Sequence, residues 1–105
     1  KSREGELILR NVRPDDHLIL LDERGKEFRS VELASMLESH ISRVGSDMVF
    51  AVGGAHGFSE PVYRRSNSMV SLSKMTFSHQ MVRVIFVEQL YRAFTIMKGE
   101  PYHHE

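Results

Sequence analysis

Two short apolar runs constrain the fold of this chain more than any other feature. They are His17–Asp22, which reads HLILLD, and Met48–Val52, which reads MVFAV. A strand with water on one face alternates apolar and polar residues, whereas a strand buried on both faces of a parallel sheet is almost continuously apolar. Both runs show the second pattern. We therefore predict a parallel sheet that is covered on both faces, with Met69–Ser73 as a third strand.

Helices are predicted around and between these strands. Pro14 cannot continue a helix, so the opening residues are expected to form the end of one. Ser30 is suited to cap a helix that runs to Val44, and a short helix is expected after Ser59. The longest helix is expected at His79–Met97, with loops at 25–30 (GKEFRS) and 74–78. This alternation indicates the α/β class with a parallel sheet, in a single domain that spans residues 1–105.

The last predicted helix is apolar over an unusually large part of its circumference. A stripe of about 100° is enough for a helix to cover a sheet. Here one stripe is formed by Val84, Val87, Tyr91 and Phe94, and it is widened by Met81, Ile85, Phe86, Leu90, Ala93 and Met97. A chain of 105 residues could hardly cover such a helix on both sides, whereas a second copy could. We therefore predict a homodimer, with a helix enclosed inside one chain as the alternative.

Composition and charge narrow the classes of function. No run of about 18 apolar residues and no basic leader followed by an apolar stretch occurs, so we expect no membrane span, no signal peptide and a cytoplasmic location. Bases and acids number 14 each, but residues 61–105 hold six bases against three acids. An anionic partner is expected to bind this basic part of the chain, and ordinary solvated side chains are the alternative interpretation.

The second apolar run ends in a cluster of glycines within the stretch FAVGGAHGFS. Gly53, Gly54 and Gly57 lie at the carboxyl end of the predicted strand, and open parallel sheets bind ligands at that edge. Ordered glycines in a cluster require positive φ angles or a close approach to bare backbone. A tight turn or a ligand would explain them, and we predict a ligand loop here.

Other motifs of known chemistry are incomplete or absent. The order G-G-x-x-G differs from the G-x-G-x-x-G of dinucleotide-binding folds, and no acid that could hold a ribose lies between Glu60 and Glu88. A nucleotide-binding oxidoreductase remains an alternative, although this sequence lacks the acidic residue that would hold the ribose. The chain has no P-loop motif and no G-x-S-x-G motif of hydrolases. It also has no cysteine, and its 6 histidines show no H-x-x-x-H or HExxH spacing, so we expect no metal site.

Three separated segments resemble one known family. They are LLDERGKEF at 20–28, VGGAHGFS at 52–59, and LSKMTFSHQMVRVIFVEQLYRAFTIMKGEPYHHE at 72–105. In order and spacing they are similar to the ribosomal RNA large-subunit methyltransferase H family of the SPOUT superfamily, over nearly the whole chain. The resemblance implies a parallel α/β sheet with a C-terminal trefoil knot, an obligate homodimer, and S-adenosylmethionine as methyl donor. The implied product is N3-methylpseudouridine in a hairpin loop of 23S rRNA, made on assembled ribosomes.

The resemblance also implies which residues form the site. The cofactor is expected to contact Leu21, Gly53, Gly54, Gly57, Leu72, Ser73, Lys74, Met75, Thr76 and Phe77. Tyr102 and His103 match the family's terminal Tyr-His, which is expected beside the cofactor, and His103 is the expected proton acceptor or base-orienting group. Contacts with RNA are expected from His79, Arg83, Arg92 and His104.

Two departures from the family bear on the expected activity. His104 stands where the family commonly has Arg or Lys, and histidine is a weaker cation near neutral pH. In the family, about 50 residues that carry a first strand and helix precede the position of Lys1, so we expect this chain to be a fragment or a trimmed product. The alternative to an active pseudouridine methyltransferase is therefore a cofactor-binding but catalytically inactive dimeric fragment, or a ribosome-assembly module. Cofactor binding without methyl incorporation would identify that alternative.

Overall fold

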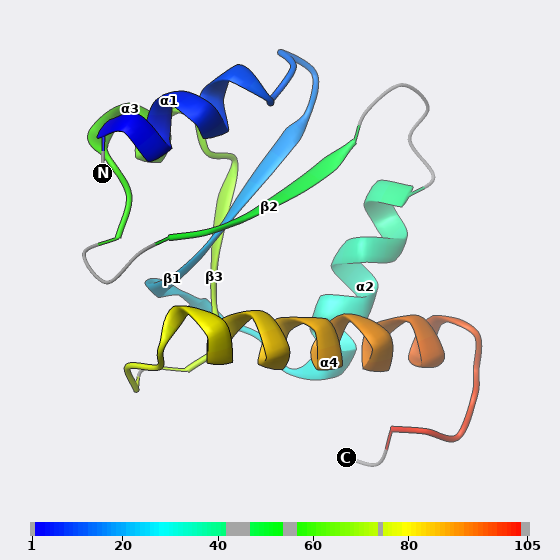
Figure 1. Cartoon of the computed structure of the whole chain (residues 1–105). Coiled ribbons are helices and arrows are strands. Elements are labelled where there is room, and N and C mark those ends of the chain that lie inside the picture. The colour runs from blue at the N-terminus through cyan, green and yellow to red at the C-terminus, as the bar shows by residue number, and fades with distance from the viewer. Residues whose placement is uncertain (1, 42–46, 54–56, 74, 104–105) are drawn as a thin grey trace.

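The computed structural model describes residues 2–41, 47–53, 57–73 and 75–103. In this part of the chain, three parallel strands form one sheet in the order β2-β1-β3. The strands are β1 (His17–Glu27), β2 (Met48–Val52) and β3 (Ser68–Ser71), and the helices are α1 (Ser2–Arg10), α2 (Ser30–Ile41), α3 (Glu60–Arg65) and α4 (His79–Met97) (Figure 1). The predicted α/β class with a parallel sheet is confirmed. The trefoil knot that the resemblance implies stays a prediction.

Helices cover both faces of the sheet, as the continuous apolar runs predict. Side chains alternate between the two faces of a strand. On one face, Leu18 and Leu20 of β1 pack with residues beneath α1 and α3, among them Phe58. On the other face, Ile19 and Leu21 pack with residues that α2 and α4 cover. Figure 1 shows the same layers, with α1 and α3 on one side of the sheet and α2 and α4 on the other.

Strand β1 is longer than predicted. The expected loop at 25–30 was wrong for its first residues, because β1 continues to Glu27 and pairs with β3 a second time after a register shift. Gly25 permits this second pairing, since a Cβ there would lie 2.7 Å from the backbone carbonyl carbon of Met69. A segment with few apolar side chains carries no local strand signal. Its structure depends on a partner strand that is distant in the sequence.

The start of α2 is stabilised differently from the prediction. The backbone N–H of Arg29 donates to Glu32 Oε1 at 2.7 Å, so a first-turn glutamate satisfies this helix end. Ser30 is the first residue of the helix and not its cap, and its hydroxyl donates to Gln89 Oε1 of α4 at 2.7 Å. This bond ties α2 to α4 on the same face of the sheet. The predicted end of this helix at Val44 lies outside the described residues.

Helix α4 has the predicted bounds, and local caps explain both of them. At its start, the Met81 N–H donates to the Ser78 hydroxyl at 3.2 Å. At its end, Gly99 has a φ of 73°, and the Glu100 N–H donates to the Thr95 carbonyl at 2.8 Å. Left-handed glycines of this kind commonly terminate helices.

One face of α4 is buried and the opposite face is not covered by the described part of the chain. Ala93 is fully buried, and Leu90 and Met97 pack against the same cluster beside α2. We call Val84, Val87, Tyr91 and Phe94 the outer stripe, and these side chains are between 39% and 63% exposed. The apolar stripe that the sequence predicts is therefore present at the surface of this protomer.

Candidate functional site

A cavity of about 420 Å³ lies at the carboxyl edge of the sheet. Segments of or next to all three strands line it: Leu21–Arg24 within β1, where its pairing with β2 ends, Val52–Gly53 at the end of β2, and Leu72–Ser73 after β3. The chain passes from β1 to β2 on one side and then crosses to β3 on the other. The direction of strand order reverses at β1, and such reversals leave a crevice that binds ligands.

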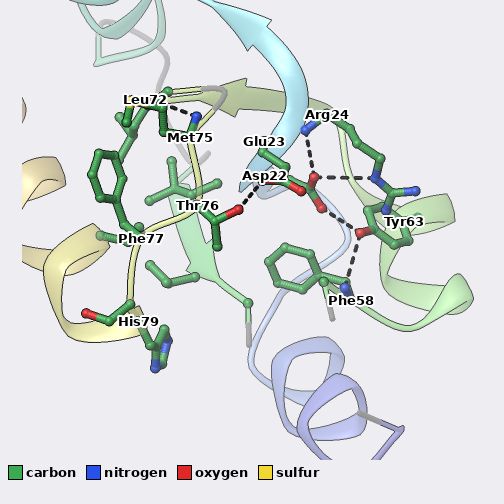
Figure 2. Close-up of a pocket in the computed structure, with 17 residues that line it drawn as sticks. Asp22, Glu23, Arg24, Phe58, Tyr63, Leu72, Met75, Thr76, Phe77 and His79 are labelled. Atoms are coloured by element: carbon green, nitrogen blue, oxygen red, sulfur yellow. Dashed lines mark hydrogen bonds and ion pairs between the residues drawn. The ribbon is translucent and has the colours of Figure 1, made fainter. Parts of the chain in front are cut away.

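Two walls face each other across this cavity in Figure 2. One wall carries Asp22, Arg24, Phe58 and Tyr63, and the other carries Leu72, Met75, Thr76, Phe77 and His79. The Thr76 hydroxyl donates to Glu23 Oε2 at 3.4 Å, which links the two walls. On the second wall, the Met75 N–H donates to the Ser73 hydroxyl at 3.0 Å and shapes the turn before α4.

The Asp22 carboxylate is the buried charge of the site, with its side chain only 6% exposed. Tyr63 donates to Asp22 Oδ2 at 2.5 Å, and the backbone N–H of Arg24 donates to Oδ1 at 2.9 Å. The Arg24 guanidinium Nε also reaches Oδ1 at 3.4 Å. Burial by itself would raise the pKa of Asp22, but the hydrogen bonds from Tyr63 and Arg24 hold this pKa below its ordinary value. The carboxylate is therefore ionised at neutral pH.

Tyr63 of α3 is held on several sides at the cavity wall. The Arg24 guanidinium carbon lies 4.4 Å from the ring centroid, and the Phe58 ring meets it edge-on with centroids 5.7 Å apart. The Phe58 N–H also donates to the Tyr63 hydroxyl oxygen at 3.2 Å. The sequence predicted a short helix after Ser59 but gave no role at the site to Tyr63, which lies in that helix.

Most of the predicted cofactor residues come together at the cavity. Leu21, Gly53, Gly57, Leu72, Ser73, Met75, Thr76 and Phe77 all line it. Gly54 and Lys74 lie outside the described residues. His79, which the resemblance placed with the RNA contacts, lies at the cavity as well. The lining residues that sequence reasoning did not assign are Asp22, Glu23, Arg24, Val52, Phe58, Tyr63, Ser78 and Val82.

The glycines at this edge are required by the packing of the protein itself. Gly57 has a φ of 79°, and a Cβ there would lie 2.5 Å from the Tyr63 hydroxyl oxygen. A Cβ at Gly53 would lie 3.0 Å from the Phe58 ring. Close packing at both positions and the positive φ at Gly57 therefore account for these two glycines, which both line the cavity.

The Tyr102–His103 tail lies on α4 and does not line the cavity. Tyr102 donates to Glu88 Oε2 at 3.0 Å, and Arg92 Nη1 donates to His103 Nδ1 at 3.1 Å. Arg92 and Glu88 also form an ion pair at 2.7 Å. Along a helix axis, the distance from His79 to Arg92 is roughly 20 Å. Figure 1 shows the tail folded back beneath α4.

The charges around this tail are mutually stabilised. The hydrogen bond from Arg92, with a second one from Tyr102, holds the pKa of Glu88 below its ordinary value. The same carboxylate raises the pKa of the Tyr102 hydroxyl. Arg92 therefore binds the tail in this protomer, whereas Arg83 is exposed on α4. His104 lies outside the described residues.

The described residues hold neither a membrane span nor a metal cluster. No described helix is long and apolar enough to cross a bilayer. Among the residues that the structure describes, no group of three or more His, Cys, Asp or Glu side chains could hold a metal ion.

Comparison with known proteins decides the family. The family model described as "Predicted SPOUT methyltransferase" matches residues 1–103. The chain belongs to this family. The ribosomal RNA large subunit methyltransferase H of Parabacteroides distasonis is 57% identical over all 105 residues, and that of Bacteroides thetaiotaomicron is 56% identical. In both cases the chain covers 67% of the relative's own length. The SPOUT family and its methyltransferase H group, which the three motifs predicted, are therefore confirmed.

A solved SPOUT-type structure supports the fold. The chain is similar to the crystal structure of Archaeoglobus fulgidus Nep1 bound to S-adenosylhomocysteine, with a TM-score of 0.53 and 22% sequence identity. The similarity covers 84% of this chain and 36% of that one. At this level of identity the match concerns the fold alone.

Proposed function

We propose that this chain transfers a methyl group from S-adenosylmethionine to N3 of a pseudouridine in 23S rRNA, in the cytoplasm and as a homodimer. The observation that carries the proposal is the cavity, which gathers the described members of the predicted cofactor set from three separate segments. The name of the relatives supports large-subunit ribosomal RNA as the substrate. The S-adenosylhomocysteine bound to the Archaeoglobus protein supports the choice of cofactor.

The cavity suits this cofactor in size and in chemistry. Small-molecule sites commonly have volumes of about 300–1,000 Å³, and this cavity lies in that range, with both apolar and polar side chains on its walls. Leu21, Val52 and Leu72 supply apolar surface, while the Gly53 and Gly57 segments bring backbone groups to the wall. When bound, S-adenosylmethionine supplies a methyl group on a positively charged sulfur.

The chain's own residues then have two tasks. Leu21, Leu72 and Phe77 exclude water from the cavity, which strengthens the electrostatic interactions inside it. Methylation at N3 also requires that the base be unstacked and that its N3 proton be removed. We propose that His103 accepts the N3 proton and that Tyr102 orients the base.

In the proposed homodimer, the Tyr102–His103 tail of one copy would lie near the cavity of the other copy. Burying the outer stripe of α4 against a second copy removes this apolar surface from water. The Tyr102 ring meets Tyr91 of the outer stripe edge-on, with centroids 4.9 Å apart, so the tail adjoins the proposed interface. We further propose that the tail of one protomer serves the cavity of its partner.

The test is methyl incorporation from labelled S-adenosylmethionine into ribosomes that lack the modification. We expect incorporation at a single pseudouridine. His103→Ala is expected to lower its rate about 100-fold and to leave cofactor affinity unchanged. Glu38→Ala, at an exposed position on α2, is the control and is expected to have no effect. Saturable cofactor binding without any incorporation would contradict the proposal and favour the inactive module.

A further inference from the structure

The Asp22–Tyr63 pair is part of the cavity wall, yet the proposed function gives it no task. We propose that Tyr63 is a positioning residue of the cofactor pocket: its hydroxyl ties the Gly57–Phe58 segment to Asp22 of β1 and holds the cavity in its binding shape. The identity of the ligand rests on the proposed function. The contacts that define the role are properties of this chain alone.

A single oxygen atom joins three segments of the chain. The Tyr63 hydroxyl donates to Asp22 Oδ2 at 2.5 Å and accepts from the Phe58 N–H at 3.2 Å. Asp22 belongs to β1, Phe58 lies between β2 and α3, and Tyr63 belongs to α3. A carboxylate can only accept and a backbone N–H can only donate, so a hydroxyl is suited to bridge them. The bond to the ionised carboxylate is of the stronger, charge-assisted kind.

The surroundings of the ring leave this hydroxyl little freedom. The Arg24 guanidinium lies over the ring, and its Nε is held in turn by the Asp22 carboxylate. Phe58, which is buried, packs edge-on against the same ring. Figure 2 shows the hydroxyl between Asp22 and the Phe58 nitrogen, at the rim of the cavity. Tyr63 is thus fixed by the two groups that it connects.

The backbone at Gly57 packs closely against this hydroxyl. At Gly57 the backbone has a φ of 79°, and a Cβ there would collide with the Tyr63 oxygen. Gly57 and Phe58 both line the cavity. Loss of the hydroxyl would therefore release part of the cavity wall without removing an apolar side chain from it. This separates a positioning role from plain core packing, which would depend on the ring.

The test compares Tyr63→Phe, which keeps the ring, with Ser66→Ala. Ser66 also carries a hydroxyl next to α3, but it donates locally to the Tyr63 carbonyl at 2.8 Å and does not line the cavity. The measurements are the affinity for S-adenosylmethionine by calorimetry, amide exchange at Phe58 by NMR without ligand, and the thermal midpoint. We expect Tyr63→Phe to weaken affinity about tenfold and to speed Phe58 exchange about tenfold, with kcat at saturating cofactor nearly unchanged. Ser66→Ala should change neither the affinity nor the exchange at Phe58.

A double-mutant cycle tests whether the hydroxyl acts through Asp22. Asp22→Asn keeps an acceptor oxygen but removes the charge, so we expect a smaller loss of affinity than in Tyr63→Phe. Combining the two changes should cost less than the sum of the single effects, because both act on one hydrogen bond. Additive effects would show that Asp22 serves the ligand independently, and this would overturn the proposed role.

The outcomes separate this inference from the proposed function. If Tyr63→Phe leaves both affinity and Phe58 exchange unchanged, the inference is overturned while the proposed function stands. If the unaltered chain binds no S-adenosylmethionine, the proposed function fails. Phe58 exchange then decides the inference by itself: faster exchange in Tyr63→Phe supports it, and unchanged exchange overturns it.

Discussion

Asp16 and Asp22 hold negative charges almost out of reach of water, before and within the buried strand β1. Asp16 is 5% exposed, and the N–H groups of Arg13 and Asp47 donate to its carboxylate at 2.9 and 3.4 Å. Buried charges are costly unless hydrogen bonds satisfy them. These two carboxylates therefore stabilise the fold only while they are ionised.

Lowering the pH should remove the contribution of Asp16 and Asp22 to the free energy of unfolding. The Arg13 N–H leads the hydrogen bonds that lower the pKa of Asp16, and those of Tyr63 and Arg24 outweigh burial in lowering the pKa of Asp22. Because both folded-state pKa values lie below the ordinary 3.8, the unfolded state takes up protons first as pH falls. The stability is fully present above pH 3.8 and is lost as pH falls further. Urea midpoints measured from about pH 6 to pH 2.5 should show this loss, with a shallower slope in Asp22→Asn. Equal slopes for the two proteins would refute the assignment to Asp22.

Alanine substitutions at Gly57 and Gly99 should separate the cost of backbone strain from the cost of crowding. Gly57 and Gly99 both have positive φ, but nothing lies within 4 Å of a Cβ placed at Gly99. Gly99→Ala should therefore lower the free energy of unfolding by about 1 kcal/mol through strain alone. Gly57→Ala should cost more and should also weaken cofactor binding, because its Cβ meets the Tyr63 hydroxyl. Chemical denaturation and calorimetry measure the two effects, and equal costs at the two positions would contradict the crowding.

Single residues of the site were predictable only where they belong to a motif. The glycines and Leu72–Phe77 could be assigned because quoted segments resemble a family, and their described members line one cavity. Asp22 and Tyr63 stand 41 positions apart, so no local pattern signals their hydrogen bond. The one available signal was general, since a tyrosine hydroxyl that is partly buried usually finds a partner.

The boundaries of helices and strands were predicted well where they depend on local residues, and poorly where they depend on pairing with a distant strand. Helix α4 agrees with its prediction because Ser78 and Gly99 act within the helix ends. The extension of β1 to Glu27 escaped prediction because it depends on β3. Apolar patterning also predicted the outer stripe, which is exposed in the described part of the chain, while the homodimer that would cover it stays a prediction.

A charge placed in the outer stripe tests the homodimer. Val87 is 63% exposed, so Val87→Glu should leave the fold of the protomer intact. In a dimer the same change would bury an unpaired carboxylate, and we expect a shift to monomer with a loss of at least tenfold in dimer affinity. Sedimentation measures the oligomeric state. Ser35→Glu, which adds the same charge to the exposed side of α2, is the control. A dimer of unchanged affinity in Val87→Glu would contradict an interface on the outer stripe.

At the scale of the whole molecule, charge and topology point to different parts of the function. Bases and acids balance at 14 each, so the release of counterions contributes little to RNA binding and a shaped ribosomal surface is the expected substrate. The parallel sheet with its reversal at β1 creates the cavity, whose walls come from segments far apart in the chain. Recognition of the cofactor therefore depends on the complete sheet.

Calorimetric titration of the purified chain with S-adenosylmethionine would show whether this cavity binds the cofactor. NAD is the control ligand, because a dinucleotide site is the alternative that the glycine cluster raises. We expect saturable binding of S-adenosylmethionine, near one site per chain or per dimer, and no binding of NAD. Absence of S-adenosylmethionine binding, or equal binding of NAD, would contradict this expectation.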